Sequence, residues 1–341
     1  MSINIRDDDA LNLDKVTFHR EEIMFYRFIK TGIVMAALAA TITTASAADW
    51  SPSGPIKLMI AFTAGGGVDT QARMIAADLQ ARHGWKIIPE NLPGKGGAVM
   101  ARALIAEPAD GLTIGMTVSE AITYSSIASR DAGYSASDFT MLTTTTGSQM
   151  GLFAKSSRGW KTLSDVIAAA KGGQKITLGA MSPKLADGAY LIGKKNGFDF
   201  TTVMVKGGKG ALNGVLADDL DVGWGAGPQN KAVAAGDLVN LVSAEATKLN
   251  VSPDAPLLSE YGVSTILGAK FMFVAPAGLP DDARATITKA IIDVVSDPTT
   301  KVNAMINKAF SGVETISGSK LDAYIASLSA GDQALLDATS E

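Results

Sequence analysis

Short apolar runs that end in glycine clusters and lead into helical patterns dominate this chain. Residues 57–62 have the length and composition of a buried strand, and Gly65-Gly66-Gly67 follows after two residues. From Asp69 to Arg82, apolar residues recur at helical spacing, with Asp69 placed to cap the helix and Gly84 to end it. The repetition of this strand–loop–helix unit predicts an α/β fold with mostly parallel sheets that are buried on both faces.

The same order restarts after Leu152, which suggests a second, similar lobe without a compositional linker. Ser182-Pro183 is a strong helix start, because Ser caps well and Pro suits the first helical position. That helix is predicted to run to Asn196. Further strands are predicted at 86–89, 112–118, 175–180, 202–206, 221–225, 238–243 and 270–275. Further helices are predicted at 97–106, 162–171 and 231–235 and from residue 280.

Composition argues against most familiar kinds of catalytic, metal and nucleic-acid site. The 341 residues carry a formal net charge of −4 without a long basic run, so we do not expect a nucleic-acid partner. There is no cysteine, and His19 and His83 are the only histidines. The chain therefore lacks the residues needed for thiolate metal sites, multi-histidine metal centres and Ser-His-Asp triads. The sequence predicts no metal, no cofactor and no catalysis.

The N-terminal region has the pattern of an export signal. Arg27 and Lys30 precede an apolar stretch at 31–40, and Ala45-Ser46-Ala47 offers small residues to signal peptidase. The apolar stretch is too short to span a bilayer, which takes about 20 residues. Met24 has the context of a signal start. We therefore interpret residues 1–47 as an upstream extension plus a signal peptide, cleaved near Ala47/Ala48, and predict a periplasmic protein.

Glycine-rich loops that follow strands are the candidate binding elements. Such a loop presents backbone N–H groups and the positive end of a helix to an anion. The first loop is a poor dinucleotide motif, since Thr70 stands where the third glycine is needed. The segment 93–97 lacks the upstream Gly and the Ser or Thr of a P-loop. Several such loops spread over two lobes predict a ligand cleft at the carboxyl ends of the strands.

Trp224 lies near the end of the predicted strand 221–225. Alternation along a strand is compatible with two positions for this side chain, the core or the wall of the cleft. In the cleft, the indole would stack on a flat ligand or donate one hydrogen bond. This interpretation predicts a ligand with a planar or apolar body.

An ordered set of motifs resembles the receptors of tripartite tricarboxylate transporters, the Bug or TctC family. The resemblance covers essentially residues 54–341. The motifs are the strand from Pro55 into Phe62-x-x-Gly65-Gly66-x-x-Asp69, Glu90-Asn91-x-Pro93-Gly94-x-Gly96-Gly97, Ala109-Asp110-Gly111-x-Thr113, Gly236-Asp237-Leu238, the segment 255–262 and Ala275-Pro276-Ala277-Gly278-Leu279-Pro280.

The resemblance implies a type II periplasmic-binding-protein fold, in which two Rossmann-like lobes close on a small carboxylate. Domain I would comprise 54–150 plus 276–341, and domain II 151–275. It also implies a monomer that serves the membrane subunits of such a transporter, with the carboxylate held by backbone amides and ordered waters after the first strand. The expected ligand-binding residues are Phe62, Thr63, Ala64, Gly65, Gly66, Asp69, Ser119, Met181, Ser182, Lys206, Gly207, Trp224, Gly225 and Ala226.

Some positions depart from the family pattern. Lys95 occupies a position where the family has alanine, Ala64 one where it has proline, and Leu257 one where it has threonine. Trp224-Gly225-Ala226 replaces an aromatic residue followed by Asp, which leaves the identity of the ligand open. Two other functions remain alternatives: a secreted α/β enzyme that acts on a carboxylate, and a solute-sensing accessory of a sensor kinase.

Overall fold

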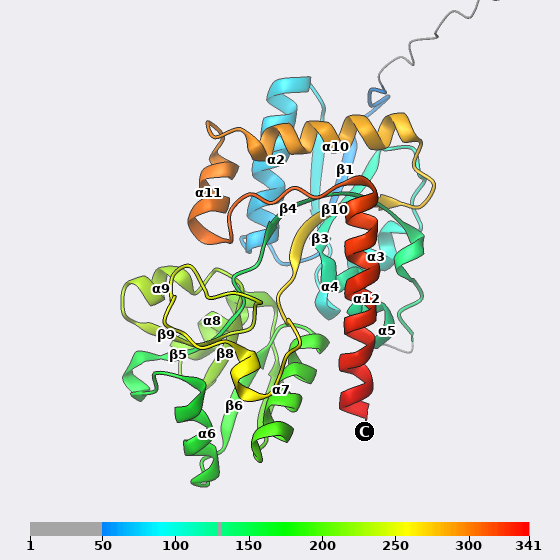
Figure 1. The fold of residues 1–341 in the computed structure, drawn as a ribbon. Coiled ribbons are helices and arrows are strands. Elements are labelled where there is room, and N and C mark those ends of the chain that lie inside the picture. The colour runs from blue at the N-terminus through cyan, green and yellow to red at the C-terminus, as the bar shows by residue number, and fades with distance from the viewer. Residues whose placement is uncertain (1–49, 129–130, 341) are drawn as a thin grey trace, which may run out of the picture. The chain divides into compact units, whose positions relative to one another are not determined.

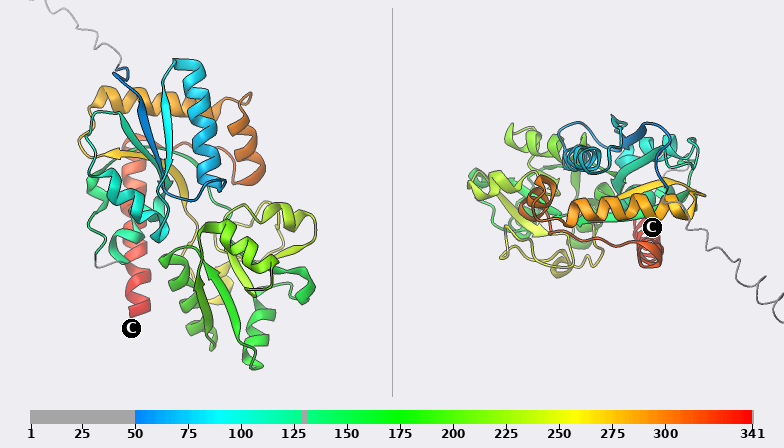
Figure 2. Two further views of the ribbon diagram at one scale, coloured as in Figure 1. Left: turned by 180° about the vertical axis from the view of Figure 1, so that it is seen from behind. Right: turned by 90° about the horizontal axis from the view of Figure 1, so that it is seen from above.

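Two five-stranded sheets organise the structure, a computed structural model that describes residues 50–128 and 131–340. The predicted signal segment lies outside the described residues. Figures 1 and 2 show the two sheets one above the other, with helices packed around each. We call the parts built around them the first lobe and the second lobe. The predicted α/β fold with two lobes is confirmed.

The first sheet has the strand order β2-β1-β3-β10-β4. β2, β1 and β3 pair in parallel, whereas β10 pairs antiparallel to both β3 and β4. The expectation of mostly parallel strands therefore needs a correction, because β10 brings the chain back from the second lobe and enters this sheet in the opposite direction. The strands are β1 (Ile56–Ile60), β2 (Ile87–Asn91), β3 (Thr113–Val118), β4 (Phe139–Gly147) and β10 (Lys270–Pro276).

The second sheet repeats this plan with the order β7-β6-β8-β5-β9. Here β5, which receives the chain from the first lobe, is antiparallel to its neighbours β8 and β9. Each sheet thus contains one reversed strand next to a crossing between the lobes. The strands are β5 (Gly151–Lys155), β6 (Ile176–Ala180), β7 (Phe200–Met204), β8 (Val222–Gly225) and β9 (Leu238–Ser243).

The helices begin and end largely where local residues predict. α2 ends at Gly84, whose φ of 70° suits a residue without Cβ. Ser182 caps α7, and Pro183 opens it, as predicted. The helices are α2 (Gly67–His83), α3 (Ala98–Leu104), α4 (Ser119–Ile122), α5 (Tyr124–Ala128), α6 (Leu163–Lys171), α7 (Pro183–Asn196), α8 (Gly207–Leu216), α9 (Asn230–Ala234), α10 (Asp281–Ser296), α11 (Lys301–Ala309) and α12 (Gly318–Ser340).

The chain crosses between the sheets at residues 147–150 and at residues 244–269. The two crossings are hydrogen-bonded to each other: the Ser148 backbone N–H donates to the Ala269 carbonyl at 2.8 Å, and the Ala269 N–H donates to the Ser148 hydroxyl at 2.9 Å. α12, red in Figure 1, starts beside the first sheet and runs along α5 and α7. The lobes are therefore joined at the crossings and along this helix. The exact domain limits stay a prediction.

Candidate functional site

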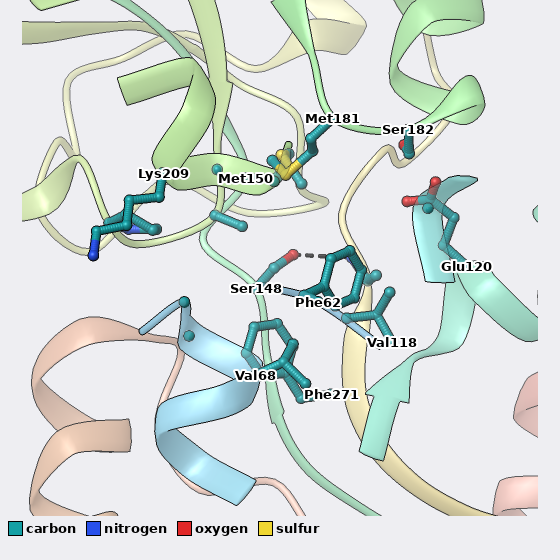
Figure 3. A pocket seen from close by; sticks show the side chains of 18 of the residues that line it. Phe62, Val68, Val118, Glu120, Ser148, Met150, Met181, Ser182, Lys209 and Phe271 are labelled. Carbon is teal, nitrogen blue, oxygen red and sulfur yellow. Dashed lines mark hydrogen bonds between the residues drawn. The ribbon is translucent and has the colours of Figure 1, made fainter. Parts of the chain in front are cut away.

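A cavity of about 80 Å³ lies where elements of both sheets meet (Figure 3). The first lobe contributes the β1–α2 loop and the ends of β3 and β10, and the second contributes the β6–α7 loop, the start of α8 and the β8–α9 loop. Its walls are mainly apolar, with Phe62, Val118, Met150, Met181 and Phe271 among them. The carboxyl ends of β1, β3, β6 and β8 thus converge on one site. In open α/β sheets, ligands bind at these ends of the strands.

Half of the predicted binding residues line this cavity: Phe62, Thr63, Gly66, Met181, Ser182, Gly207 and Ala226. They come from four loops that are far apart in the sequence. Lys206 lines an adjoining outer cleft instead. The remaining predicted residues, Ala64, Gly65, Asp69, Ser119, Trp224 and Gly225, are not among those that line the cavity.

Two backbone N–H groups of the β1–α2 loop that were predicted to bind the ligand donate to the loop itself or to the start of α2. The Gly65 N–H donates to the Asp69 carboxylate at 2.8 Å, and the Gly66 N–H donates to the Thr63 carbonyl at 3.2 Å. α2 begins at Gly67 with Gly66 as its N-cap, so the expectation that Asp69 caps the helix is wrong, and Gly67 and Val68 line the cavity. Because the first N–H groups of a helix have no intrahelical acceptor, the first turn of α2 offers backbone donors next to the cavity.

Asp69 holds the loop rather than a ligand. Its side chain is buried and also accepts hydrogen bonds from Arg73 Nε at 2.8 Å and Asn91 Nδ2 at 2.9 Å. Burial alone would raise the pKa of Asp69, but the hydrogen bonds from Gly65, Asn91 and Arg73 keep it below its usual value. The ionised carboxylate therefore fixes the loop that leads into α2.

Trp224 lies in the core of the second lobe. The side chain is fully buried, and its indole N–H donates to the Leu185 carbonyl at 3.1 Å. Of the two positions that alternation left open, the structure places the ring in the core, so the argument for a planar ligand loses its basis. The apolar side chains of the cavity still fit an apolar ligand body.

Ser119 and Gly225 are also packed into the fold. The buried Ser119 hydroxyl accepts a hydrogen bond from the Lys270 N–H at 3.1 Å, which ties α4 to β10. A Cβ on Gly225 would lie 2.4 Å from Gln229 Oε1. Gln229 in turn accepts from the Gly227 N–H and donates to the Gly225 carbonyl, so its amide shapes the β8–α9 loop. These residues support the site without lining it.

Sequence reasoning missed several lining residues, of which Glu120, Ser148 and Lys209 are polar. Glu120 follows β3, at the same edge of the sheet as the glycine loop. Ser119, at the same strand end, was among the predicted residues, but its neighbour Glu120 is the residue that lines the cavity. The rule that ligands bind at the carboxyl ends of strands points to this edge of the sheet without telling which of two adjacent side chains faces the ligand.

The outer cleft has a volume of about 1120 Å³ and shares Phe62, Thr63, Gly96, Met181 and Gly207 with the cavity. Lys95, Arg102 and Lys206 line it. Their charges raise the local concentration of anions in front of the cavity.

Within the described residues, no three His, Cys, Asp or Glu side chains are grouped in a way that could hold a metal ion. None of the helices described is both long and apolar enough to cross a membrane. The described histidine, His83, ends α2, whereas Gly67 at the start of that helix lines the cavity. A 17-residue helix is about 25 Å long, so His83 lies far from the site.

Two α/β lobes with a cavity between them are an arrangement that suits a solute-binding protein. The family model described as "Tripartite tricarboxylate transporter family receptor" matches residues 71–337, and the chain belongs to this family. It is thus a solute-binding receptor of the kind that serves these transporters. A Cupriavidus necator protein, "UPF0065 protein in gbd 5'region", is 27% identical over 260 residues, 73% of this chain and 78% of the relative.

Solved structures show the same fold. The periplasmic binding protein BugD aligns with a TM-score of 0.75 and 19% identity, over 85% of this chain and 99% of its own. A protein of R. palustris with adipate also has a TM-score of 0.75, with 21% identity over 86% and 99% of the two chains. MatC from Rhodopseudomonas palustris, with bound malate, reaches 0.71 with 21% identity over 85% and 98%.

Proposed function

We propose that this receptor binds a small carboxylate with an apolar body between its lobes and presents it to the membrane subunits of a tripartite tricarboxylate transporter. The observation that carries the proposal is the start of α2, whose first residues Gly67 and Val68 line a mainly apolar cavity. The positive end of a helix attracts an anion and its backbone N–H groups bind it. Lys209, which also lines the cavity, adds a positive charge.

The neighbouring structures support the same class of ligand, since one contains adipate and another malate. The basic outer cleft favours the approach of an anion. We further propose that the protein works as a monomer outside the cytoplasm, after cleavage near Ala47/Ala48. The predicted domains, residues 54–150 plus 276–341 and residues 151–275, would close on the ligand, with β10 (Lys270–Pro276) counted in the first of them because it belongs to the first sheet.

Replacing Gly66 with Val tests the anion site. A Cβ on Gly66 meets only the Thr63 carbonyl oxygen, at 3.2 Å, a tight contact that the loop must relieve by shifting a few tenths of an ångström. The branched side chain would stand at the mouth of the first turn of α2 and keep a carboxylate from its N–H groups. We expect a loss of about 2–4 kcal/mol in binding free energy, from charge-assisted hydrogen bonds that no longer form.

Isothermal titration with short mono- and dicarboxylates measures this loss. Gly331→Val is the matched control, because Gly331 is exposed on α12 and a Cβ there meets nothing within 4 Å. Unchanged affinity in a folded Gly66→Val protein would show that the first turn of α2 does not hold the ligand.

A further inference from the structure

Glu120 presents an unused acceptor to the cavity. It is only 5% exposed, it lies in α4 just after β3, and its Oε1 has no hydrogen-bond partner among the described residues. Figure 3 shows its carboxylate turned toward Ser182 and well separated from Lys209. A buried acceptor without a donor costs free energy that a matching ligand group would recover.

The surroundings of Glu120 contain further charges from two other helices. Lys184 of α7 and Asp332 of α12 form a buried ion pair at 2.8 Å, and Thr123 also donates to Asp332. Tyr124 and Tyr134 lie close enough to interact with the Glu120 charge. Burial raises the pKa of Glu120 to about 7, and Lys184 and the Ser182 hydroxyl only partly oppose this shift.

Charge balance decides what Glu120 prefers to bind. With Glu120 ionised, Lys184, Asp332 and Glu120 together carry one net negative charge, and Lys209, a cation that also lines the cavity, lies well apart from this group. A cation in the cavity neutralises it, whereas a second carboxylate leaves one negative charge in an apolar space even if Glu120 takes up a proton. Because uncompensated charge is costly in such a space, the cation is favoured.

We propose that the ligand is an amino carboxylate whose protonated amine binds Glu120 while its carboxylate binds the first turn of α2. The assignment rests on the proposed function, which supplies the carboxylate end. It adds a second recognition point, at the end of the neighbouring strand β3, and it makes Glu120 the residue that selects amine-bearing ligands over plain acids.

Matched pairs of compounds test this assignment on the full mature protein by titration calorimetry. The probes are glycine, β-alanine, 4-aminobutyrate and 5-aminopentanoate, each paired with the alkanoate that lacks the amine, together with malonate, succinate, glutarate and adipate. We expect at least one amino carboxylate to bind ten times or more tightly than its alkanoate. Glu120→Gln should remove this advantage, while Glu90→Gln, an exposed residue of β2 outside the cavity, should keep it.

The pH dependence in the unmodified protein gives a second measurement that needs no variant. Amines of the probes stay protonated and their carboxylates stay ionised between pH 6 and 8. If only ionised Glu120 binds the amine, affinity for the amino carboxylate should rise about tenfold from pH 6 to pH 8, since the pKa of the free site is about 7. In Glu120→Gln this rise should be absent.

Each other outcome overturns the assignment. Equal affinity for both members of every pair, with alkanoates or dicarboxylates bound, would reject the amine site and leave the carboxylate receptor standing. Dicarboxylates that bind more tightly than amino carboxylates and gain affinity as pH falls would show instead that protonated Glu120 donates to a second carboxylate. No binding of any carboxylate would reject both the amine site and the proposed function.

Discussion

Asp69 and Glu120 follow adjacent strands of the first sheet, yet the protein uses the two acids in opposite ways. Asp69, after β1, accepts hydrogen bonds from Gly65, Arg73 and Asn91. Glu120, after β3, keeps one oxygen without a partner among the described residues and lines the cavity. The pKa of Asp69 lies below its usual value although burial alone would raise it, whereas burial raises the pKa of Glu120 to about 7.

The difference teaches that a place at the end of a strand brings an acid to the ligand edge without deciding its role. The role follows from whether the fold itself supplies donors. The fold supplies hydrogen-bond donors to both oxygens of the Asp69 carboxylate, so ionisation of this residue stabilises the loop. Around Glu120 they are incomplete, so its ionised form is stabilised fully only when another group enters the cavity.

Asp69→Ala should have the largest effect on stability. The change leaves the Gly65 N–H and the Asn91 amide without the buried acceptor they share, at a cost of about 3–4 kcal/mol in the free energy of unfolding. Because the pKa of Asp69 is lowered on folding, its contribution is present above about pH 4 and is lost as pH falls.

Urea unfolding at pH 7 and pH 3 measures both effects of Asp69→Ala. The control is Asp78→Ala, on the same helix and only half-buried. A loss of less than 1 kcal/mol at pH 7 would show that the bonds to Asp69 contribute little, and the contrast with Glu120 would then fail.

Glu120→Gln should have the opposite sign. The folded protein binds more protons at Glu120 than the unfolded chain between about pH 4.5 and pH 7, so its stability falls as pH rises through this window. Gln has no charge to bury. The unliganded variant should therefore match the parent near pH 4.5 and be about 3 kcal/mol more stable at pH 8, from a shift of about 2.5 pKa units.

Chemical unfolding across this pH range checks the prediction for Glu120→Gln. A variant that is less stable than the parent at pH 8 would mean that Lys184 and Ser182 stabilise the ionised carboxylate fully in the empty protein. The residue would then resemble Asp69, and its cost of burial could not be recovered by a ligand.

Local sequence signals were enough to predict much of the fold. Gly84, Ser182 and Pro183 act within one turn of a helix, and such short-range effects are readable from neighbours in the chain. The strand β4 was missed because Phe139–Gly147 contains four consecutive threonines and looks polar. Its hydroxyls are paired across the fold, for example Thr145 with Gln71 Oε1 at 2.8 Å and Thr146 with the Gly312 carbonyl at 2.7 Å.

The binding loops could be predicted, whereas the side chains that face the ligand could not all be. Loops that follow predicted strands, glycine-rich except for Met181-Ser182-Pro183, located the β1–α2, β6–α7, α8 and β8–α9 parts of the site. Whether Trp224 faces the core or the cleft depends on Leu185, 39 residues away, whose carbonyl accepts its indole N–H. Glu120 and Ser148 depend likewise on which strands become neighbours, and only the tertiary structure determines that.

Arg73→Ala should have the smallest effect and sharpens the comparison from the side of Asp69. Arg73 is one of the three donors to Asp69, but its side chain is 46% exposed, so water can replace it. Gly65 and Asn91 would still hold the carboxylate. We expect a loss of about 0.5–1 kcal/mol in unfolding free energy, a smaller loss at 1 M salt, and unchanged ligand affinity.

Urea unfolding at low and high salt measures this loss. A loss close to that of Asp69→Ala would show that the ion pair, rather than the backbone and amide donors, fixes the loop. The different roles of Asp69 and Glu120 would then be due to the exposed cation Arg73.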